Sequence, residues 1–245
     1  MPTLIIPCYN EADRLNQTAF VEFSQQNPDI GFLFVNDGST DTTSVMIAAM
    51  IMQAGKQIKL LDLPGNVGKA EAVRQGILLT LRENPPEYVG YWDADLATPL
   101  DAVHDLRRAA ATTPKKRFVC GSRVRRMGAS IERQCLRHYF GRVVATAAST
   151  ILDLPFYDTQ CGAKLIESEL AALIFRQPFI SRWLFDLELI ARIIEAFGHP
   201  EACRTILEVP LREWKDIGES KIRLSYLPRI PYELFLIQQT YRHCL

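Results

Sequence analysis

Short segments that favour β-strands alternate with segments of helical periodicity along the first half of this chain. The strand-like segments are rich in β-branched and aromatic residues and read TLIIPCY, GFLFVND, KQIKLLDL, EYVGYWDADL and RFVCGSR. Apolar residues recur at helical spacing in 42–54, just after the cap-forming types Ser39, Thr40 and Asp41, and again in 69–82. The alternation predicts an α/β fold in which helices flank a mostly parallel sheet.

The composition is that of a globular protein. The chain has 245 residues, 48% hydrophobic and 23% charged, which suffices for one large core or two small ones. The formal net charge is +0, so no overall field indicates a nucleic acid partner. The six cysteines lack CxxC spacing and the four histidines add no zinc pattern, which favours free thiols. Since there is no signal-peptide pattern and no apolar run of about 18 residues, we expect a cytoplasmic protein, free or on the inner face of a membrane.

Polar residues follow three of the predicted strands, at 10–11, 37–39 and 93–95. Ligands of open α/β sheets bind at this edge, outside the carboxyl ends of the strands. Neither GxGxxG nor GxxxxGK[ST] occurs, so nothing indicates a dinucleotide or P-loop site. The segment GNVGKAEAV, 65–73, has two interpretations: a glycine turn that brings backbone and Lys69 to an anion, or a plain entry into a helix.

Asp93 and Asp95 stand two positions apart at the end of a strand-like segment. Within a strand, side chains at i and i+2 point to the same side, so we expect the two carboxylates to repel each other. A divalent cation with oxygen ligands would relieve the repulsion and keep positions for phosphate oxygens. The alternative is a helix cap or a solvated turn.

Five motifs, IIPCYNE, VNDGSTD, GNVGKAEAV, DADLAT and CGSR, together resemble those of the inverting glycosyltransferases of family 2, which have the GT-A fold. DTQCGAKL, WLFDLELI and WKDIGESK narrow the resemblance to the branch of dolichyl-phosphate glucosyl- and mannosyltransferases, and DADLAT followed by DTQCG is more similar to the glucosyl members. The resemblance covers Thr3 to about Tyr241. It implies a Rossmann-like, mostly parallel sheet and transfer of a hexose from a nucleotide sugar to a polyprenyl phosphate.

The resemblance also implies a donor site. UDP-glucose is the favoured donor and GDP-mannose the second, with Mg²⁺ or Mn²⁺ held by Asp95 directly and by Asp93, which also suits the ribose or an outer contact. The expected nucleotide-sugar-binding residues are Pro7, Tyr9, Asn10, Glu11, Asp37, Gly38, Asn66, Gly68, Lys69, Asp93, Ala94 and Asp95.

The acceptor side is expected in the arginine-rich segment that follows CGSR. Arg133 and Arg137 are spaced i, i+4 and would share a helix face with phosphate-binding geometry, although a solvated face is the alternative. The resemblance implies an acceptor phosphate or diphosphate site with these members: Arg123, Arg133, Arg137, Ser220 and Lys221. Around Lys221 the chain reads GESK where the family reads EGSK, and Ala163 replaces a common aromatic after QCG, so both contacts depart from the pattern.

The expected catalytic residues are Arg123, Asp158 and Asp186. A phosphate monoester is already ionised near neutral pH, so the two aspartates would position it rather than deprotonate it. Asp158 could instead stabilise a turn, Asp186 and Glu188 could cap or pair, and Cys161 suits packing. Two other hypotheses stay open: a same-fold transferase that uses a hydroxyl acceptor, and a nucleotide-sugar-binding module without turnover.

We expect a GT-A domain over 1–222, with a nucleotide-sugar half at 1–124 and an acceptor half at 125–222. The remaining segment, 223–245, combines apolar and aromatic residues with arginines and predicts a helical, amphipathic extension. Such a helix either packs on the domain or makes peripheral contact with a membrane interface.

Overall fold

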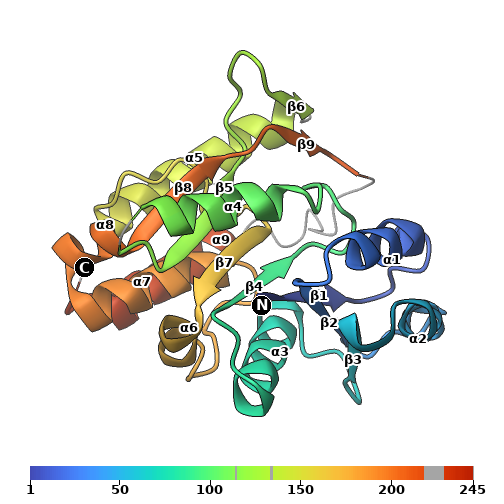
Figure 1. Cartoon of the computed structure of the whole chain (residues 1–245). Helices are drawn as coiled ribbons and strands as arrows, with labels where there is room; N and C mark the ends of the chain where they lie inside the picture. The colour runs from blue at the N-terminus through green and yellow to red at the C-terminus, as the bar shows by residue number, and fades with distance from the viewer. Residues whose placement is uncertain (114, 133–134, 218–228, 245) are drawn as a thin grey trace.

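The computed structural model describes residues 1–113, 115–132, 135–217 and 229–244, without the side chains of 135–140. Strands and helices alternate as predicted (Figure 1). The strands are β1 (Thr3–Cys8), β2 (Gly31–Asn36), β3 (Ile58–Asp62), β4 (Tyr88–Trp92), β5 (Phe118–Ser122), β6 (Ser130–Glu132), β7 (Ala163–Glu167), β8 (Ile206–Pro210) and β9 (Glu213–Lys215). The α-helices are α1 (Gln17–Gln26), α2 (Thr43–Ala54), α3 (Lys69–Glu83), α4 (Ala102–Thr112), α5 (Cys135–Leu152), α6 (Ser168–Ile174), α7 (Phe185–Phe197), α8 (His199–Thr205) and α9 (Arg229–Tyr241).

The main sheet has seven strands in the order β3-β2-β1-β4-β7-β5-β8, so the expected mostly parallel α/β sheet is confirmed. Only β7 runs antiparallel to its neighbours, β4 and β5, among the pairings that the structure describes. The short strands β6 and β9 form a separate pair that projects from one side of the molecule (Figure 1). The insertion of β7 between β4 and β5 places the turn before β7 next to the carboxyl end of β4.

Helices cover both faces of the sheet because successive side chains of each strand point to opposite sides. On β1, Leu4 and Ile6 join one apolar cluster, while Ile5 joins the other. The first cluster includes residues of α1, α2 and α4, such as Phe20, whose ring packs edge-on against Phe34 at a centroid distance of 4.9 Å. The second includes residues of α3, α6, α7 and α9. A sheet fixed on both faces supplies a rigid edge for the polar loops.

The fourth strand is shorter than the sequence pattern indicates. It ends at Trp92, and Asp93 and Asp95 lie in the turn that follows, where Leu96 has φ 55°. The expectation that strand alternation points both carboxylates to one side was therefore wrong. Their proximity arises from the turn, in which the Leu96 amide donates to the Asp93 carbonyl at 3.3 Å.

Gly90 marks the tightest approach between β4 and β7. A Cβ at this position would lie 2.0 Å from the carbonyl oxygen of Lys164. Replacing Gly90 by alanine is expected to lower the free energy of unfolding by about 3 kcal/mol, because backbone would have to move in a packed sheet. Urea unfolding measures this, with Gly31→Ala as control, where the nearest atom is the flexible end of Met1 at 3.1 Å. Equal stability of the two variants would contradict the prediction.

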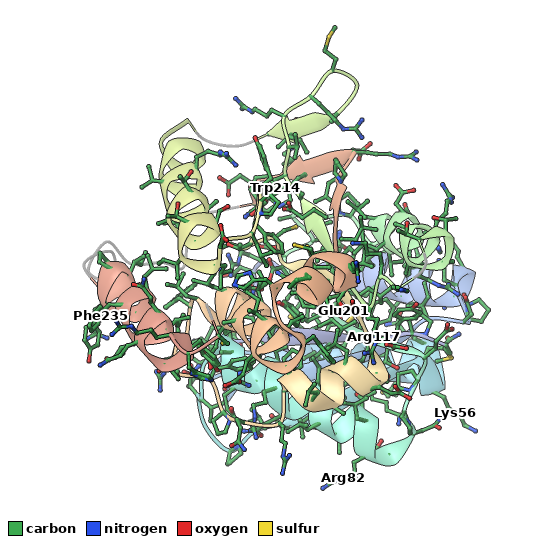
Figure 2. The ribbon with its side chains drawn as sticks, turned by 90° about the vertical axis from the view of Figure 1, so that its left-hand side faces the viewer. Lys56, Arg82, Arg117, Glu201, Trp214 and Phe235 are labelled. Carbon is green, nitrogen blue, oxygen red and sulfur yellow. The ribbon has the colours of Figure 1, made fainter. Side chains whose placement is uncertain are left out.

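The C-terminal helix α9 packs on α7 through buried residues that include Ile230, Ile237 and Tyr241. Packing on the domain, one of the two alternatives for this segment, is thus observed for 229–241. The helix also exposes Tyr232 and Phe235, 62% and 56% accessible, and Phe235 points outward in Figure 2. None of the helices in the described part of the chain has the length and apolar character needed to cross a membrane.

Candidate active site

Asp37 builds the turn that leads into α3. Its buried carboxylate, in a residue with 1% exposure, accepts from the amides of Val67 at 2.7 Å and Gly68 at 2.9 Å and from Asn66 Nδ2 at 3.0 Å. Burial raises the pKa of Asp37, and the two amide bonds oppose that rise. The residue after Asp37 must be glycine for this turn to approach so closely. Gly38 has φ +64°, and a Cβ on it would lie 2.5 Å from the Gly65 backbone.

The loop after β1 is tied to the loop after β2. Asn10, with φ 49°, accepts from the Thr40 amide at 2.9 Å and donates its own amide to Ser39 Oγ at 3.0 Å. Glu11 is buried and pairs with Arg14 at 2.7 Å. Pro7 is the penultimate residue of β1, and Tyr9 stands just beyond it with 40% exposure. These two loops and the Asp37 turn converge at the carboxyl edge, as predicted.

Asp93 and Asp95 form an acidic pair beside Lys69. Lys69 Nζ is 2.5 Å from Asp93 Oδ1, and both side chains are about one-third exposed. Burial lowers the pKa of Lys69, but Asp93 and then Asp186 raise it above its usual value. Burial and the neighbouring Asp93 raise the pKa of Asp95, whose carboxylate accepts from the Ala97 amide at 3.1 Å. Ala94 between them is buried.

These carboxylates fit a hard cation in one respect, since repulsion between Asp93 and Asp95 would fall when a divalent ion lay between them. Two carboxylates leave several positions to water or phosphate oxygens, as such ions require. No cluster of three or more potential metal-ligating side chains occurs in the described ranges. Asp93 and Asp95 thus fit a hard cation that takes its remaining oxygen ligands from elsewhere.

Arg123 and Asp158, which the sequence pattern assigns to the acceptor and to catalysis, form a two-pronged ion pair. Arg123 Nε and Nη2 donate to the two carboxylate oxygens at 2.6 and 2.7 Å, and the side chains are 12% and 9% exposed. Burial lowers the pKa of Arg123, but Asp158 raises it above its ordinary value, so the guanidinium stays charged. The Trp214 ring, labelled in Figure 2, lies 5.3 Å from it. Glu208 holds the loop that carries Asp158, because its carboxylate accepts hydrogen bonds from the Tyr157 and Asp158 amides, both at 2.8 Å.

Asp186 lies in the first turn of α7 and is buried. It accepts from Lys164 Nζ at 2.6 Å and from the Tyr91 hydroxyl. Burial and Asp186 raise the pKa of Tyr91 well above its usual value, so the phenol stays a donor. Glu188 pairs with Arg192 at 2.7 Å inside the core, so the alternative of an ion pair holds for Glu188. Cys161 is buried, as its expected role in packing requires.

The acidic pair and the turn that follows Asp158 meet at Gly162. The Asp93 amide donates to the Gly162 carbonyl at 3.1 Å, and a Cβ on Gly162 would lie 1.8 Å from Asp93 Oδ2. The turn that starts at Asp158 therefore touches the acidic pair directly. Arg133, the side chain of Arg137, Ser220 and Lys221 fall outside the described residues, so the structure does not place these four expected acceptor contacts.

Three residues near the site were not predicted. Lys164 and Tyr91 hold Asp186, and the only sequence signal for Lys164 is a charge within the apolar stretch CGAKLI. Arg182, in the loop before α7, lies 3.7 Å from the position of a Cβ on Gly68 and lowers the pKa of Asp37 by its charge. Nothing in the local pattern around Arg182 indicates a contact more than 110 residues away in sequence.

A family model described as "Glycosyl transferase family 2" matches residues 3–175. The chain belongs to glycosyltransferase family 2. The expected family membership is thus confirmed, and two relatives named dolichyl-phosphate beta-glucosyltransferase confirm the expected branch and identify the protein as a hexosyltransferase. Dolichyl-phosphate beta-glucosyltransferase ALG5C of Trichomonas vaginalis is 33% identical to this family member over 98% of this chain and 71% of its own length. The human dolichyl-phosphate beta-glucosyltransferase is 28% identical over 92% of this chain and 75% of its own.

Solved GT-A glycosyltransferases share the fold of this family 2 enzyme. Glucosyl-3-phosphoglycerate synthase from Mycobacterium tuberculosis, in complex with Mn²⁺ and UDP-glucose, superposes with a TM-score of 0.69 at 17% identity, covering 100% of this chain and 79% of that one. Mannosyl-3-phosphoglycerate synthase from Rubrobacter xylanophilus superposes with a TM-score of 0.67 at 18% identity, covering 97% and 72%. At these identities the similarity establishes the GT-A fold, as expected.

Proposed function

We propose that this enzyme transfers glucose, with inversion, from UDP-glucose to a polyprenyl phosphate of the dolichyl type. GDP-mannose is the second donor candidate. The names of the relatives favour this reaction, and so does the UDP-glucose bound by a structural neighbour. The observation that carries the proposal is the contact at Gly162, where the acidic pair of the donor side meets the turn of the Arg123–Asp158 pair. A donor and an anionic acceptor would thereby meet on one edge of the sheet.

On the donor side, the loops after β1 and β2 would hold the nucleoside, and Tyr9 offers an exposed ring for a base. The turn at Asn66 and Gly68 brings backbone and the start of α3 to the phosphates. Mg²⁺ or Mn²⁺ on Asp95 and Asp93 would offset the charge that develops on the departing nucleoside diphosphate. Asp37, which builds this turn, would act through it as well as through any contact of its own with the nucleotide.

On the acceptor side, the Arg123 guanidinium would attract the lipid phosphate. An ionised phosphate oxygen then attacks the anomeric carbon while the bond from that carbon to the nucleoside diphosphate breaks, and no proton has to be removed. Two observations agree with this. Both oxygens of Asp158 are engaged by Arg123, and Asp186 already accepts from Lys164 and Tyr91, so positioning suits these carboxylates better than deprotonation of a hydroxyl acceptor.

We infer the division of the chain that its sequence pattern indicates, with 1–124 serving the donor and 125–222 the acceptor, except that Arg123, at the end of the first half, serves the acceptor. Both halves contribute strands to one continuous sheet, because β7 and β8 of the second half lie on either side of β5 of the first. For the extension 223–245 we propose peripheral contact with a cytoplasmic membrane face, where Tyr232 and Phe235 of α9 would enter the interface.

Calorimetric titration tests the donor half of the proposal. Wild-type protein is expected to bind UDP-glucose more tightly than GDP-mannose and only with Mn²⁺ or Mg²⁺ present, and Asp95→Asn is expected to weaken binding by at least about tenfold, since it removes a charged oxygen ligand. Asp101→Asn, which alters an exposed carboxylate six residues away, is the control. Metal-independent binding, or unchanged binding in Asp95→Asn, would contradict the metal assignment.

A transfer assay tests the acceptor half. Labelled glucose is expected to pass from UDP-glucose to polyprenyl phosphate and not to a polyprenol that lacks the phosphate. Transfer to the alcohol, or to a soluble sugar hydroxyl alone, would favour the alternative of a transferase with a hydroxyl acceptor.

A further inference from the structure

Lys164 is a buried cation whose hydrogen-bonding capacity is fully used. Only 1% of its side chain is exposed, although lysines are among the residues least often buried. Its ammonium donates to Asp186 Oδ1 at 2.6 Å, to the Cys161 carbonyl at 2.6 Å and to the Thr159 carbonyl at 3.2 Å. Three donors meet three acceptors, which is the condition under which a buried ammonium is tolerated.

The partners of Lys164 come from the elements that carry the site. Thr159 and Cys161 belong to the turn between Asp158 and β7, and Asp186 belongs to the first turn of α7. The ring of Tyr91, on β4 two residues before Asp93, lies 5.2 Å from the ammonium. A single side chain thus joins the acceptor turn, the helix of Asp186 and the strand that leads to the acidic pair.

The turn held by Lys164, defined here as residues 159–162, contacts both sides of the site. Its last residue accepts from the Asp93 amide, and it begins directly after the carboxylate that pairs with Arg123. Two of its side-chain atoms, Thr159 Oγ1 and Gln160 Nε2, are buried without a hydrogen-bond partner in the part of the chain that the structure describes. Buried polar atoms normally find a partner, so this turn offers groups that a ligand or water would satisfy.

We propose that Lys164 is a positioning residue for the transfer reaction: its ammonium fixes the 159–162 turn against Asp186 and so sets the spacing between Asp93 and the Arg123–Asp158 pair. This inference rests on the proposed function of the two sides. Lys164 itself does not touch a substrate, because its side chain is enclosed. Its removal should therefore change the rate of transfer more than the affinity for the nucleotide, since the Asp37 turn is held by separate hydrogen bonds.

Replacing Lys164 by methionine keeps the length of the apolar stem and removes the three donors. With Mn²⁺, UDP-glucose and polyprenyl phosphate, kcat is expected to fall about tenfold or more, because small displacements of reacting groups are costly. The Kd for UDP is expected to stay within about threefold of wild type, which separates orientation from uniform binding. Amide hydrogen exchange in a peptide covering 157–165 is expected to accelerate, which reports the turn independently of catalysis.

Lys164→Arg is expected to fold because it keeps the charge that pairs with Asp186. Its planar guanidinium cannot reproduce the geometry of the compact ammonium, so its kcat is expected to lie between those of wild type and Lys164→Met. It carries the test if the methionine variant does not fold. Lys59→Met is the matched control, because Lys59 is exposed on β3 and pairs only with Glu83 among the described residues. Wild-type kcat and exchange in the folded Lys164 variants would overturn the proposal. Wild-type protein without transferase activity would instead overturn the proposed function, while the exchange experiment would still report whether Lys164 holds the turn.

Discussion

Replacing Arg123 by leucine should lower kcat/KM for polyprenyl phosphate by about 10³-fold. This factor corresponds to a loss of about 4 kcal/mol of interaction free energy, which is typical when one member of a close charge pair is truncated. The guanidinium lies at the start of the turn that precedes β7, where it is held by Asp158 at 2.6 and 2.7 Å. Without it, a phosphate would meet the Asp158 carboxylate alone and be repelled. Donor binding should change little, since the turn at Asn66 and Gly68 is held by Asp37 and not by Arg123.

The same substitution should also destabilise the protein, because it leaves a largely buried carboxylate without its partner, a change that costs about 3 kcal/mol or more. Arg123→Lys separates the effect on activity from the effect on stability. It retains the charge and the fold but loses the paired hydrogen bonds, so its kcat/KM should lie between those of wild type and Arg123→Leu. Arg107→Leu is the control, since the Arg107–Asp29 pair is exposed on both sides. Steady-state transfer kinetics measure kcat/KM of each variant, and urea unfolding measures its stability. A folded Arg123→Leu protein with wild-type kcat/KM would rule out the acceptor role.

Replacing Gly162 by alanine should abolish most metal-dependent activity while the protein stays folded. The added Cβ would lie 1.8 Å from Asp93 Oδ2 and 2.3 Å from Asp93 Cγ. A carboxylate can rotate away at modest cost, so the expected damage is to the position of Asp93 and not to the sheet. Because a displacement of about 1 Å can reduce a rate by about 10²-fold, we expect a loss of at least that size in kcat, together with weaker Mn²⁺-dependent binding of UDP-glucose.

A double-mutant cycle tests this explanation. Asp93→Ala alone should reduce activity, and adding Gly162→Ala to it should cause little further loss, because the clashing carboxylate is then absent. Gly31→Ala, at the start of β2, is the control for an added methyl group elsewhere in the sheet. Additive effects of Asp93→Ala and Gly162→Ala would show that Gly162 acts by another route.

The strand that links the two sides of the site shows where local patterns stop being informative. The first five strands, and the helices α2 and α3 among those that connect them, were predicted, because period-2 and period-3.6 spacing of apolar residues are properties of contiguous sequence. β7, Ala163–Glu167, was not predicted as a strand. Five residues with a lysine at the second position carry no clear period, and the strand forms because β4 and β5 supply ladders on both sides of it.

The acidic pair was found for a partly wrong reason. The motif itself predicted two carboxylates near a ligand, yet the argument from strand alternation failed because β4 ends at Trp92. What brings Asp93 close to Lys69 and to the turn at Gly162 is the packing of α3 and β7 around the end of β4. Such contacts join residues 24 and 69 positions apart, which local spacing does not encode.

The sequence by itself determined the family, the α/β class and the edge of the sheet on which the polar residues gather, because each depends on motifs and periodicities within short segments. Only the tertiary structure decided how those residues are used. It paired Arg123 with Asp158, committed the Asp37 carboxylate to the turn before α3, and buried Lys164 against Asp186. The physical reason is that a charge excluded from water must find its partner in space, and that partner can come from any part of the chain.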